Sequence, residues 1–125
     1  MDSTSSIIPP IFSHKFRFSI KNIQEEYAEI LSLQIISVAL KKQEKDSKVY
    51  ADFEIDNKGL VLEAINSILN SDLNIEIKYL DNDLNPARIF YIHNAKIKCV
   101  TSESSYSNYE SLQIKVEMNC QHIIL

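Results

Sequence analysis

Hydrophobic and polar residues alternate along several stretches of this chain, and one stretch instead follows a helical period. Period-two alternation predicts half-buried β-strands over residues 12–20, 49–55, 73–79 and 111–121. The last of these is the longest clean alternation in the sequence. The pattern therefore predicts an α+β fold that is mainly β, an antiparallel sheet or barrel with one main helix packed on the sheet.

The helical stretch covers residues 58–70. Its apolar positions Ala64, Ile65, Ile68 and Leu69 recur at the three- and four-residue spacing of one helix face. Asp56 or Asn57 precedes them and is expected to cap the helix by accepting hydrogen bonds from its first free N–H groups. The apolar face is expected to cover one side of the sheet.

Two further strands are predicted at 88–92 and 95–100, joined or bent at His93-Asn94. The turn before them opens D-x-D-x-N, like a calcium-binding loop. That loop type needs Gly at its sixth place and Glu at its twelfth, which are Pro86 and Ile92 here. A hairpin turn held by Asp and Asn side chains is the better interpretation. Residues 101–110 are predicted to form a polar loop.

Residues 22–40 carry conflicting signals. EEYAEILSL has helix-forming composition, whereas QIISVAL is rich in strand formers. A turn near Asn22 followed by one strand from about residue 29 to 40 is favoured. A helix over residues 23–33 is the alternative.

The sequence also predicts the domain organisation of the chain. Residues 1–11 lead into Pro9-Pro10 and are predicted to be a flexible N-terminal arm. Residues 12–125 are expected to form a single domain. Residues 41–48 are charged and lack apolar side chains, which predicts a solvated loop.

Composition excludes several classes of function. The 125 residues carry a net charge of −4, which argues against a general grip on nucleic acid. Cys99 and Cys120 lack metal-site spacing; both are expected to be buried thiols, and whether they pair is open. His14, His93 and His122 are scattered over separate segments. We therefore expect no enzyme activity, metal or cofactor.

The N-terminus lacks the basic and apolar regions of a signal peptide, and no apolar run is long enough for a membrane span. Synthesis in the cytoplasm is expected.

The order of elements resembles a known family. The segments concerned are VYADFEIDNKGLVLEAINSIL, NIEIKYLDNDLNPARIFYIHNAKIK, the polar SYSNYESL, the terminal SLQIKVEMNCQHI, and the earlier HKFRFSIKNI and QIISVAL. Together they resemble the tail tube proteins of contractile-tailed bacteriophages, whose fold is shared with phage-tail-like bacteriocins and type VI secretion tubes. The resemblance covers residues 12–125.

This resemblance implies a structural virion protein. Subunits would form hexameric rings, each subunit giving four long strands to a barrel around a lumen, with the helix outside. Rings would stack into a tube that conducts viral DNA without binding it specifically. The implied partners are further copies of the chain, a tail sheath, and baseplate or neck proteins, and the implied location is the tail of a virion made in the host cytoplasm.

Two groups of candidate residues follow. The lumen is expected to be neutral to acidic, since a cationic wall would retain phosphates. Candidate lumen-facing residues are those on the polar faces of two strands: Tyr50, Asp52, Glu54, Gln113, Lys115, Glu117 and Asn119. Candidate subunit or ring contacts are charged or aromatic residues of the two predicted loops: Lys41, Lys42, Glu44, Lys45, Asp46, Tyr106 and Tyr109.

Other functions remain compatible with the sequence. The chain is also suited to a tube-like ring at the baseplate or neck. A monomeric α+β adaptor would instead pair with a partner at a strand edge. A nucleic-acid-binding module is a further alternative, with the basic side of residues 13–21 as its surface.

Overall fold

A computed structural model describes the backbone of residues 6–12, 15–56, 58–105 and 108–124, and the side chains of 15–56, 58–102 and 113–124. The elements are β1 (Ser6–Phe12), β2 (Phe16–Ile20), α1 (Glu25–Gln34), β3 (Ile35–Lys42), β4 (Ser47–Glu54), α2 (Leu60–Ile68), β5 (Leu73–Leu80), β6 (Pro86–Ser105), β7 (Asn108–Cys120) and β8 (His122–Ile124). The prediction of a mainly β, antiparallel fold with a helix on the sheet is confirmed. A second helix adds to it.

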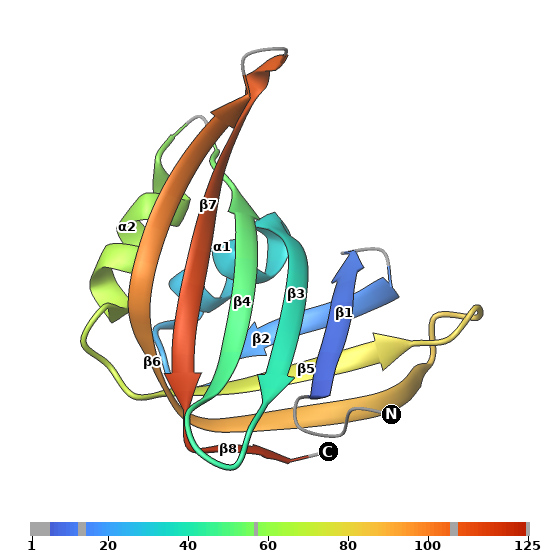
Figure 1. The fold of residues 1–125 in the computed structure, drawn as a ribbon. Helices are drawn as coiled ribbons and strands as arrows, with labels where there is room; N and C mark the ends of the chain where they lie inside the picture. The colour runs from blue at the N-terminus through green and yellow to red at the C-terminus, as the bar shows by residue number, and fades with distance from the viewer. Residues whose placement is uncertain (1–5, 13–14, 57, 106–107, 125) are drawn as a thin grey trace.

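The strands follow the order β1-β3-β4-β7-β6-β5-β2, and β8 also pairs with β6. We call β1, β3, β4, β7 and residues 96–105 of β6 the front sheet. We call β2, β5, β8 and residues 86–95 of β6 the cross sheet. Figure 1 shows the front sheet as a curved surface with both helices behind it, and the cross sheet running across its lower end. The sheet does not close on itself.

The long strand β6 connects the two sheets. Residues 86–95 pair with β5, whereas residues 96–105 pair with β7. The turning point is Asn94, which has a φ of 56° and whose N–H lies 3.5 Å from Asn74 Oδ1. The predicted bend at His93-Asn94 is thus present, within one continuous strand.

The core lies between the front sheet, the cross sheet and the two helices. The inward residues of β4 and β7 are buried, whereas the residues between them are half-buried or exposed. Phe18 of β2 and Phe53 of β4 meet edge-to-face with ring centroids 5.9 Å apart, which links the two sheets. From α2 the buried residues are Val61, Ala64, Ile65 and Ile68, and Leu31 is the buried residue of α1. Among the described residues, neither helix has the length and hydrophobicity of a bilayer-spanning segment.

The favoured strand over residues 29–40 is wrong in its first half, because Glu25–Gln34 form α1. The alternative helix over 23–33 is close to the observed element. Helix propensity prevails here because Leu31 reaches the core on one face, leaving Leu33 70% exposed on another. Strand structure begins only at Ile35, where β-branched residues start.

The predicted single strand over residues 12–20 is also wrong: Phe12 ends β1, and Phe16 begins β2. β1 pairs with β3 in the front sheet and β2 pairs with β5 in the cross sheet, so the alternation in the sequence continues across two separate strands. Residues 6–11 of the expected arm lie in β1, which pairs with β3. The division into an arm of residues 1–11 and a domain of 12–125 stays a prediction. His14 lies outside the described residues.

The predicted loop over residues 101–110 is mostly strand. Residues 101–105 continue β6, and residues 108–110 begin β7. Backbone hydrogen bonds between the two strands do not depend on side-chain polarity, so a polar sequence extends the hairpin beyond the core. The predicted helix over 58–70 is confirmed as the shorter α2, Leu60–Ile68.

Asp56 holds the start of α2. Its carboxylate accepts hydrogen bonds from the N–H groups of Leu60 (3.0 Å) and Val61 (2.9 Å), as expected of a cap. These bonds, that from Val61 first, hold the pKa of Asp56 below its usual value. The turn before β6 has the predicted side-chain bonds, because Asp81 accepts from the N–H groups of Asp83 and Asn85 at 2.9 and 3.0 Å.

The corner of β6 predicts how residue 94 tolerates substitution. Asn94→Val should lower the free energy of unfolding by roughly 1–2 kcal/mol, since a β-branched side chain is strained at positive φ. Asn94→Gly should be close to neutral because glycine adopts this conformation freely. Thermal unfolding followed by circular dichroism measures both. Equal stability of the valine and glycine variants would contradict the bend.

Candidate functional site

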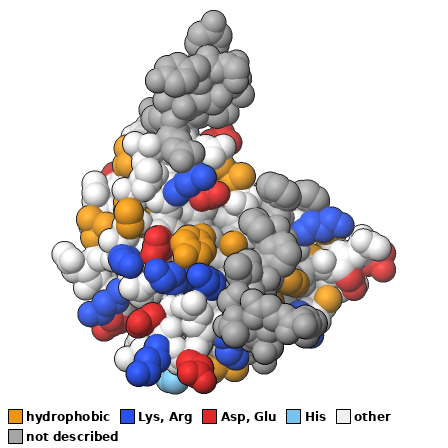
Figure 2. All heavy atoms as spheres, in the orientation of Figure 1, with side chains coloured by type: hydrophobic (Ala, Val, Ile, Leu, Met, Phe, Trp, Pro, Cys, Tyr) orange, Lys and Arg blue, Asp and Glu red, His pale blue; other side chains and the backbone are white. Residues whose placement is uncertain are grey.

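The face of the front sheet that points away from the helices carries most of its polar side chains. We call it the polar face; it is made by β3, β4, β7 and residues 96–105 of β6. Figure 2 looks onto this face and shows Lys and Asp or Glu side chains gathered around its centre. The strand register arranges them in rows that cross the sheet.

Three rows run from β3 to β6, and a fourth begins at β4. The basic row is Lys41, Lys48, Asn119 and Lys96. The next row is Ala39, Tyr50, Glu117 and Cys99, and the third is Ser37, Asp52, Lys115 and Thr101. The last is Glu54, Gln113 and Glu103.

All seven candidate lumen-facing residues therefore lie on one face, in adjacent rows of β4 and β7. Their role in lining a lumen stays a prediction. The face is held by polar contacts: Lys48 Nζ donates to Glu117 Oε2 at 3.0 Å, and Ser37 Oγ donates to Asp52 Oδ2 at 3.1 Å. Lys98 Nζ lies 3.8 Å from Glu117 Oε2, so this carboxylate has two lysine neighbours.

The hydrogen bond between Lys48 and Glu117 shifts the pKa of each group in the direction that favours its charged form. It lowers the pKa of Glu117 and raises the pKa of Lys48. Both groups are therefore ionised at neutral pH. As the two side chains are partly exposed, the pair orders the polar face more than it stabilises the fold.

Sequence reasoning missed most of the positive charge of this face. The sequence predicts this strand from residue 49, whereas β4 begins at Ser47 and so includes Lys48. Lys96 and Lys98 join the face only through the pairing of residues 96–105 with β7, which has no signal in the sequence. Five lysines thus oppose three carboxylates among the described side chains of the polar face: Lys41, Lys48, Lys96, Lys98 and Lys115 against Asp52, Glu54 and Glu117. The described side chains of the face are therefore mixed in charge, with lysines concentrated at one end.

Five of the candidate contact residues lie at one end of the front sheet: Lys41, Lys42, Glu44, Lys45 and Asp46. Lys41 and Lys42 are the last residues of β3 and not part of a loop, since β1 and β4 flank them. Residues 43–46 form the connection to β4. Tyr106 lies outside the described residues, as does the side chain of Tyr109. Their roles in assembly stay predictions.

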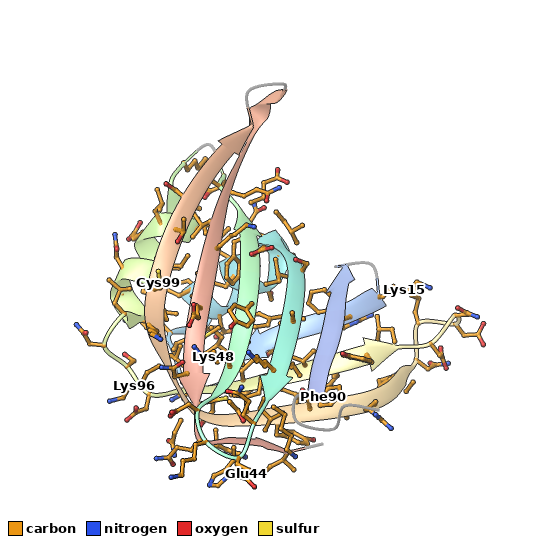
Figure 3. The ribbon with its side chains drawn as sticks, in the orientation of Figure 1. Lys15, Glu44, Lys48, Phe90, Lys96 and Cys99 are labelled. Carbon is orange, nitrogen blue, oxygen red and sulfur yellow. The ribbon has the colours of Figure 1, made fainter. Side chains whose placement is uncertain are left out.

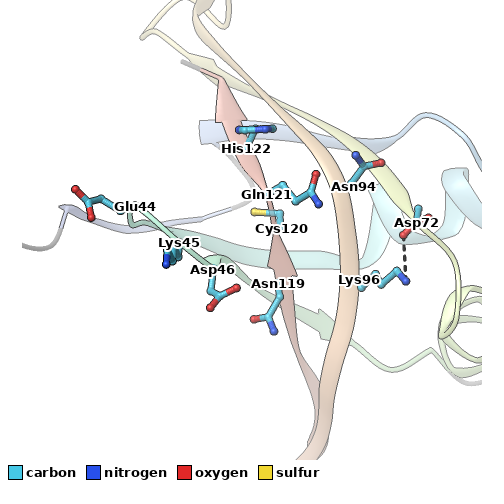
Figure 4. A pocket seen from close by; sticks show the side chains of 10 residues that line it. All are labelled: Glu44, Lys45, Asp46, Asp72, Asn94, Lys96, Asn119, Cys120, Gln121 and His122. Carbon is cyan, nitrogen blue, oxygen red and sulfur yellow. Dashed lines mark ion pairs between the residues drawn. The ribbon is translucent and has the colours of Figure 1, made fainter.

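An open hollow of about 1000 Å³ lies beside the 43–46 connection. Figure 4 shows Glu44, Lys45 and Asp46 on one side of it, and the bend of β6 with the Lys96–Asp72 ion pair (3.5 Å) on the other. Asn119 and the start of β8 complete the lining. The hollow thus brings three candidate contact residues next to a candidate lumen residue. Nowhere do the described side chains gather three His, Cys, Asp or Glu groups that would hold a metal ion.

The two cysteines differ from the expectation that both are buried. Both thiols are free; Cys120 is buried, but Cys99 is exposed on the polar face. Burial raises the pKa of Cys120 to about 11, and its Sγ donates to the Ser47 carbonyl at 3.4 Å. Cys99 is exposed because residues 96–105 of β6 form the border of the front sheet. Figure 3 shows Cys99 on this border strand, with Lys48 nearer the centre of the face.

The opposite surface, formed by the helices, carries several exposed leucines. Leu33 of α1 and Leu60 and Leu62 of α2 are each at least 40% exposed. Their neighbours on the inner side of each helix are buried in the core. The molecule therefore has a charged polar face and a helical surface that carries exposed leucines.

Two solved structures contain chains of similar fold. One is the sheath–tube complex, in its extended state, of an extracellular contractile injection system called PVC: 15% identity over 88% of this chain and 86% of that chain, with a TM-score of 0.55. The other is the baseplate of the anti-feeding prophage, symmetrised six-fold: 12% identity over 98% of this chain and 76% of that chain, with a TM-score of 0.54.

No family model matches the chain, and no curated protein does. At these identities the likeness shows a shared fold. The fold is thus that of components of contractile injection systems, in agreement with the resemblance seen in the sequence.

The two thiols provide a test of the polar face. In the native protein at pH 8, a maleimide should modify Cys99 rapidly and leave Cys120 unmodified, because the Cys120 thiol is buried and its raised pKa suppresses the thiolate. Mass spectrometry of the intact protein should show one addition, and two after denaturation. The Cys99→Ser variant serves as control and should show no native modification. One addition to that variant under native conditions would contradict the placement of Cys120.

Proposed function

We propose that this chain is a structural subunit of a contractile tail, and that it forms stacked hexameric rings of the tail tube. The observation that carries the proposal is a sheet that is polar on one face, covered by helices on the other, and open at its border. The likeness to chains of a sheath–tube complex and of a baseplate supports it.

The border strand is the main argument for assembly. Residues 96–105 of β6 pair with β7 along one edge, and no strand of the described part pairs with their other edge. Val100 in this segment is 39% exposed. A long unpaired edge invites another strand, and soluble proteins usually cover such edges. Pairing with a second copy of the chain supplies the cover and continues the front sheet into a barrel.

The position of the helices sets which face would turn inward. Placing six copies edge to edge, with the helices outside, directs the polar face to the axis (Figure 1). The rows then become belts around a lumen. Six-fold symmetry fits the symmetrised baseplate that contains a chain of this fold. Contacts that close by rotation make rings, and contacts that repeat along the axis stack them.

The charge of the polar face affects how DNA would pass through the proposed lumen. We infer that viral DNA is conducted without lasting attachment. The lysines that would hold phosphates are partly compensated: Lys48 and Lys98 share Glu117, and Lys96 pairs with Asp72. The remaining attraction is restricted to one end of the face.

The outer surface would meet the other parts of the tail. We infer that a sheath surrounds the tube and contacts the helices, where Leu60 and Leu62 are exposed. The role is structural, not catalytic, and the protein is located in the tail of a virion assembled in the host cytoplasm.

A second candidate has its own support. A chain of the anti-feeding prophage baseplate matches 98% of this chain. A ring at the baseplate, or at the neck, would use the same edges and the same polar face, but would not stack into a long tube.

Electron microscopy distinguishes these functions. The purified protein should form rings by negative-stain microscopy and hexamers by size-exclusion chromatography, and long tubes if it is the tube subunit. Rings without tubes would favour the baseplate or neck. A persistent monomer at high concentration would favour an adaptor and contradict the proposal.

In assembled rings, Cys99 should still react with a small maleimide but far more slowly with a large polyethylene glycol maleimide, because it would lie within the lumen.

The lumen charge can be tested on oligonucleotide binding. Glu117→Gln leaves Lys48 and Lys98 without their shared carboxylate, so retention of the rings on immobilised single-stranded DNA at low salt should rise several-fold. Glu54→Gln, at the other end of the same face, is the matched control and should have a smaller effect. Strong retention of the unmodified protein at physiological salt would contradict unhindered transit.

A further inference from the structure

The strand directions of the front sheet restrict how two copies can join. All neighbouring strands from β1 to β6 are antiparallel. β6 therefore runs opposite to β3 and in the same direction as β1. Subunits related by rotation about a ring axis keep these directions. The open edge of β6 would thus pair in antiparallel fashion with β3 of the next copy, but only in parallel fashion with β1.

β1 occupies the edge that the antiparallel joint requires. It pairs with β3 along residues 6–12, at the border of the front sheet opposite to β6. With β1 removed, the exposed edge of β3 is eight residues long and meets a ten-residue edge in β6. These matched lengths suit a continuous ladder, and antiparallel pairing is the slightly more stable arrangement.

The sequence of β1 weakens its pairing with β3. Its register with β3 is interrupted between Ile8 and Ile11, where the sequence is Pro9-Pro10. Proline has no N–H group to donate. In a regular strand, the backbone N–H groups of consecutive residues point to opposite edges. One proline therefore removes a donor from the ladder with β3, and the other removes a donor from the outward edge.

The two missing N–H donors have different consequences for the two edges of β1. A blunted outward edge prevents other strands from adding to the monomer, which is the usual role of proline on edge strands. A weakened inward ladder lets β1 leave. We propose that β1 is a displaceable guard: it covers the edge of β3 in the free subunit and is replaced there by residues 96–105 of a second copy. This inference rests on the proposed ring.

A disulfide between β1 and β3 tests the guard. Phe12 and Ser37 are directly paired, so Phe12→Cys/Ser37→Cys in a Cys99→Ser background should lock β1 in place when oxidised. The oxidised protein should lose ring formation, and reduction should restore it to the level of the Cys99→Ser parent. The matched control is Ala39→Cys/Tyr50→Cys, which links β3 to β4 and should assemble in both redox states.

Removal of residues 1–12 provides an independent measurement. The truncated protein should assemble at a several-fold lower concentration than the full chain, because β3 is already free. If truncation prevents folding, Ile8→Gly/Ile11→Gly weakens β1 in the intact chain and should shift assembly in the same direction.

The outcomes separate the two proposals. Rings formed equally well by the oxidised lock would show that β1 stays in place, which overturns the guard and leaves the ring intact. A folded truncated protein that no longer assembles would show that β1 is part of the joint, which also overturns the guard. Failure of the parent and every variant to assemble would overturn the ring itself.

Discussion

The backbone ladder along β6 is the constraint on which the rest of the structure depends. One strand of twenty residues pairs with β5 and β8 at its start and with β7 at its end, so both sheets share a single backbone. Because Asn94 turns the chain between the two segments, the cross sheet is placed against the lower end of the front sheet. The core then forms where inward residues of both sheets meet the helices. Neither sheet would be positioned without the other.

This arrangement also determines what the surface presents. In the first half of β6, residues 91–93 have a strand on both edges, β5 and β8, whereas in the described part of the chain the second half has a strand on one edge only. Turning away from β5 is what leaves residues 96–105 as a border. The proposed assembly would use the border that this bend leaves. The charged rows are a further result, because the register with β7 aligns Lys96 with Asn119 and thereby with Lys48 and Lys41.

Local patterns in the sequence were sufficient for several elements. The alternation in β4, β5 and β7 and the helical period of α2 each reflect one burial environment, and one-sided burial leaves a clear period. Asp56 was recognisable as a cap because its function is local. The seven polar positions chosen on β4 and β7 do share a face, since alternation alone decides this.

The errors came where distant partners decide the structure. Phe12 and Phe16 share a period but belong to different sheets. Residues 25–34 bury little more than Leu31, so their apolar pattern was too weak to separate helix from strand. Residues 101–105 are strand through pairing with β7, not through their composition. The lysines of the basic row fall in two separate predicted segments, the loop over 41–48 and the strand over 95–100, and only the register brings them together. Pairing across the chain has no local signature.

The uneven placement of lysines along the strands gives each subunit an electrical polarity parallel to the proposed axis. In a column of identical rings, this polarity would repeat once per ring, so a travelling polyanion would meet alternating shallow minima and maxima of potential. A polymer that spans many rings occupies minima and maxima at once, and its total energy then changes little as it advances. Local attraction would therefore be compatible with smooth motion of a long cargo, whereas the energy of a short anionic fragment would rise and fall once per ring.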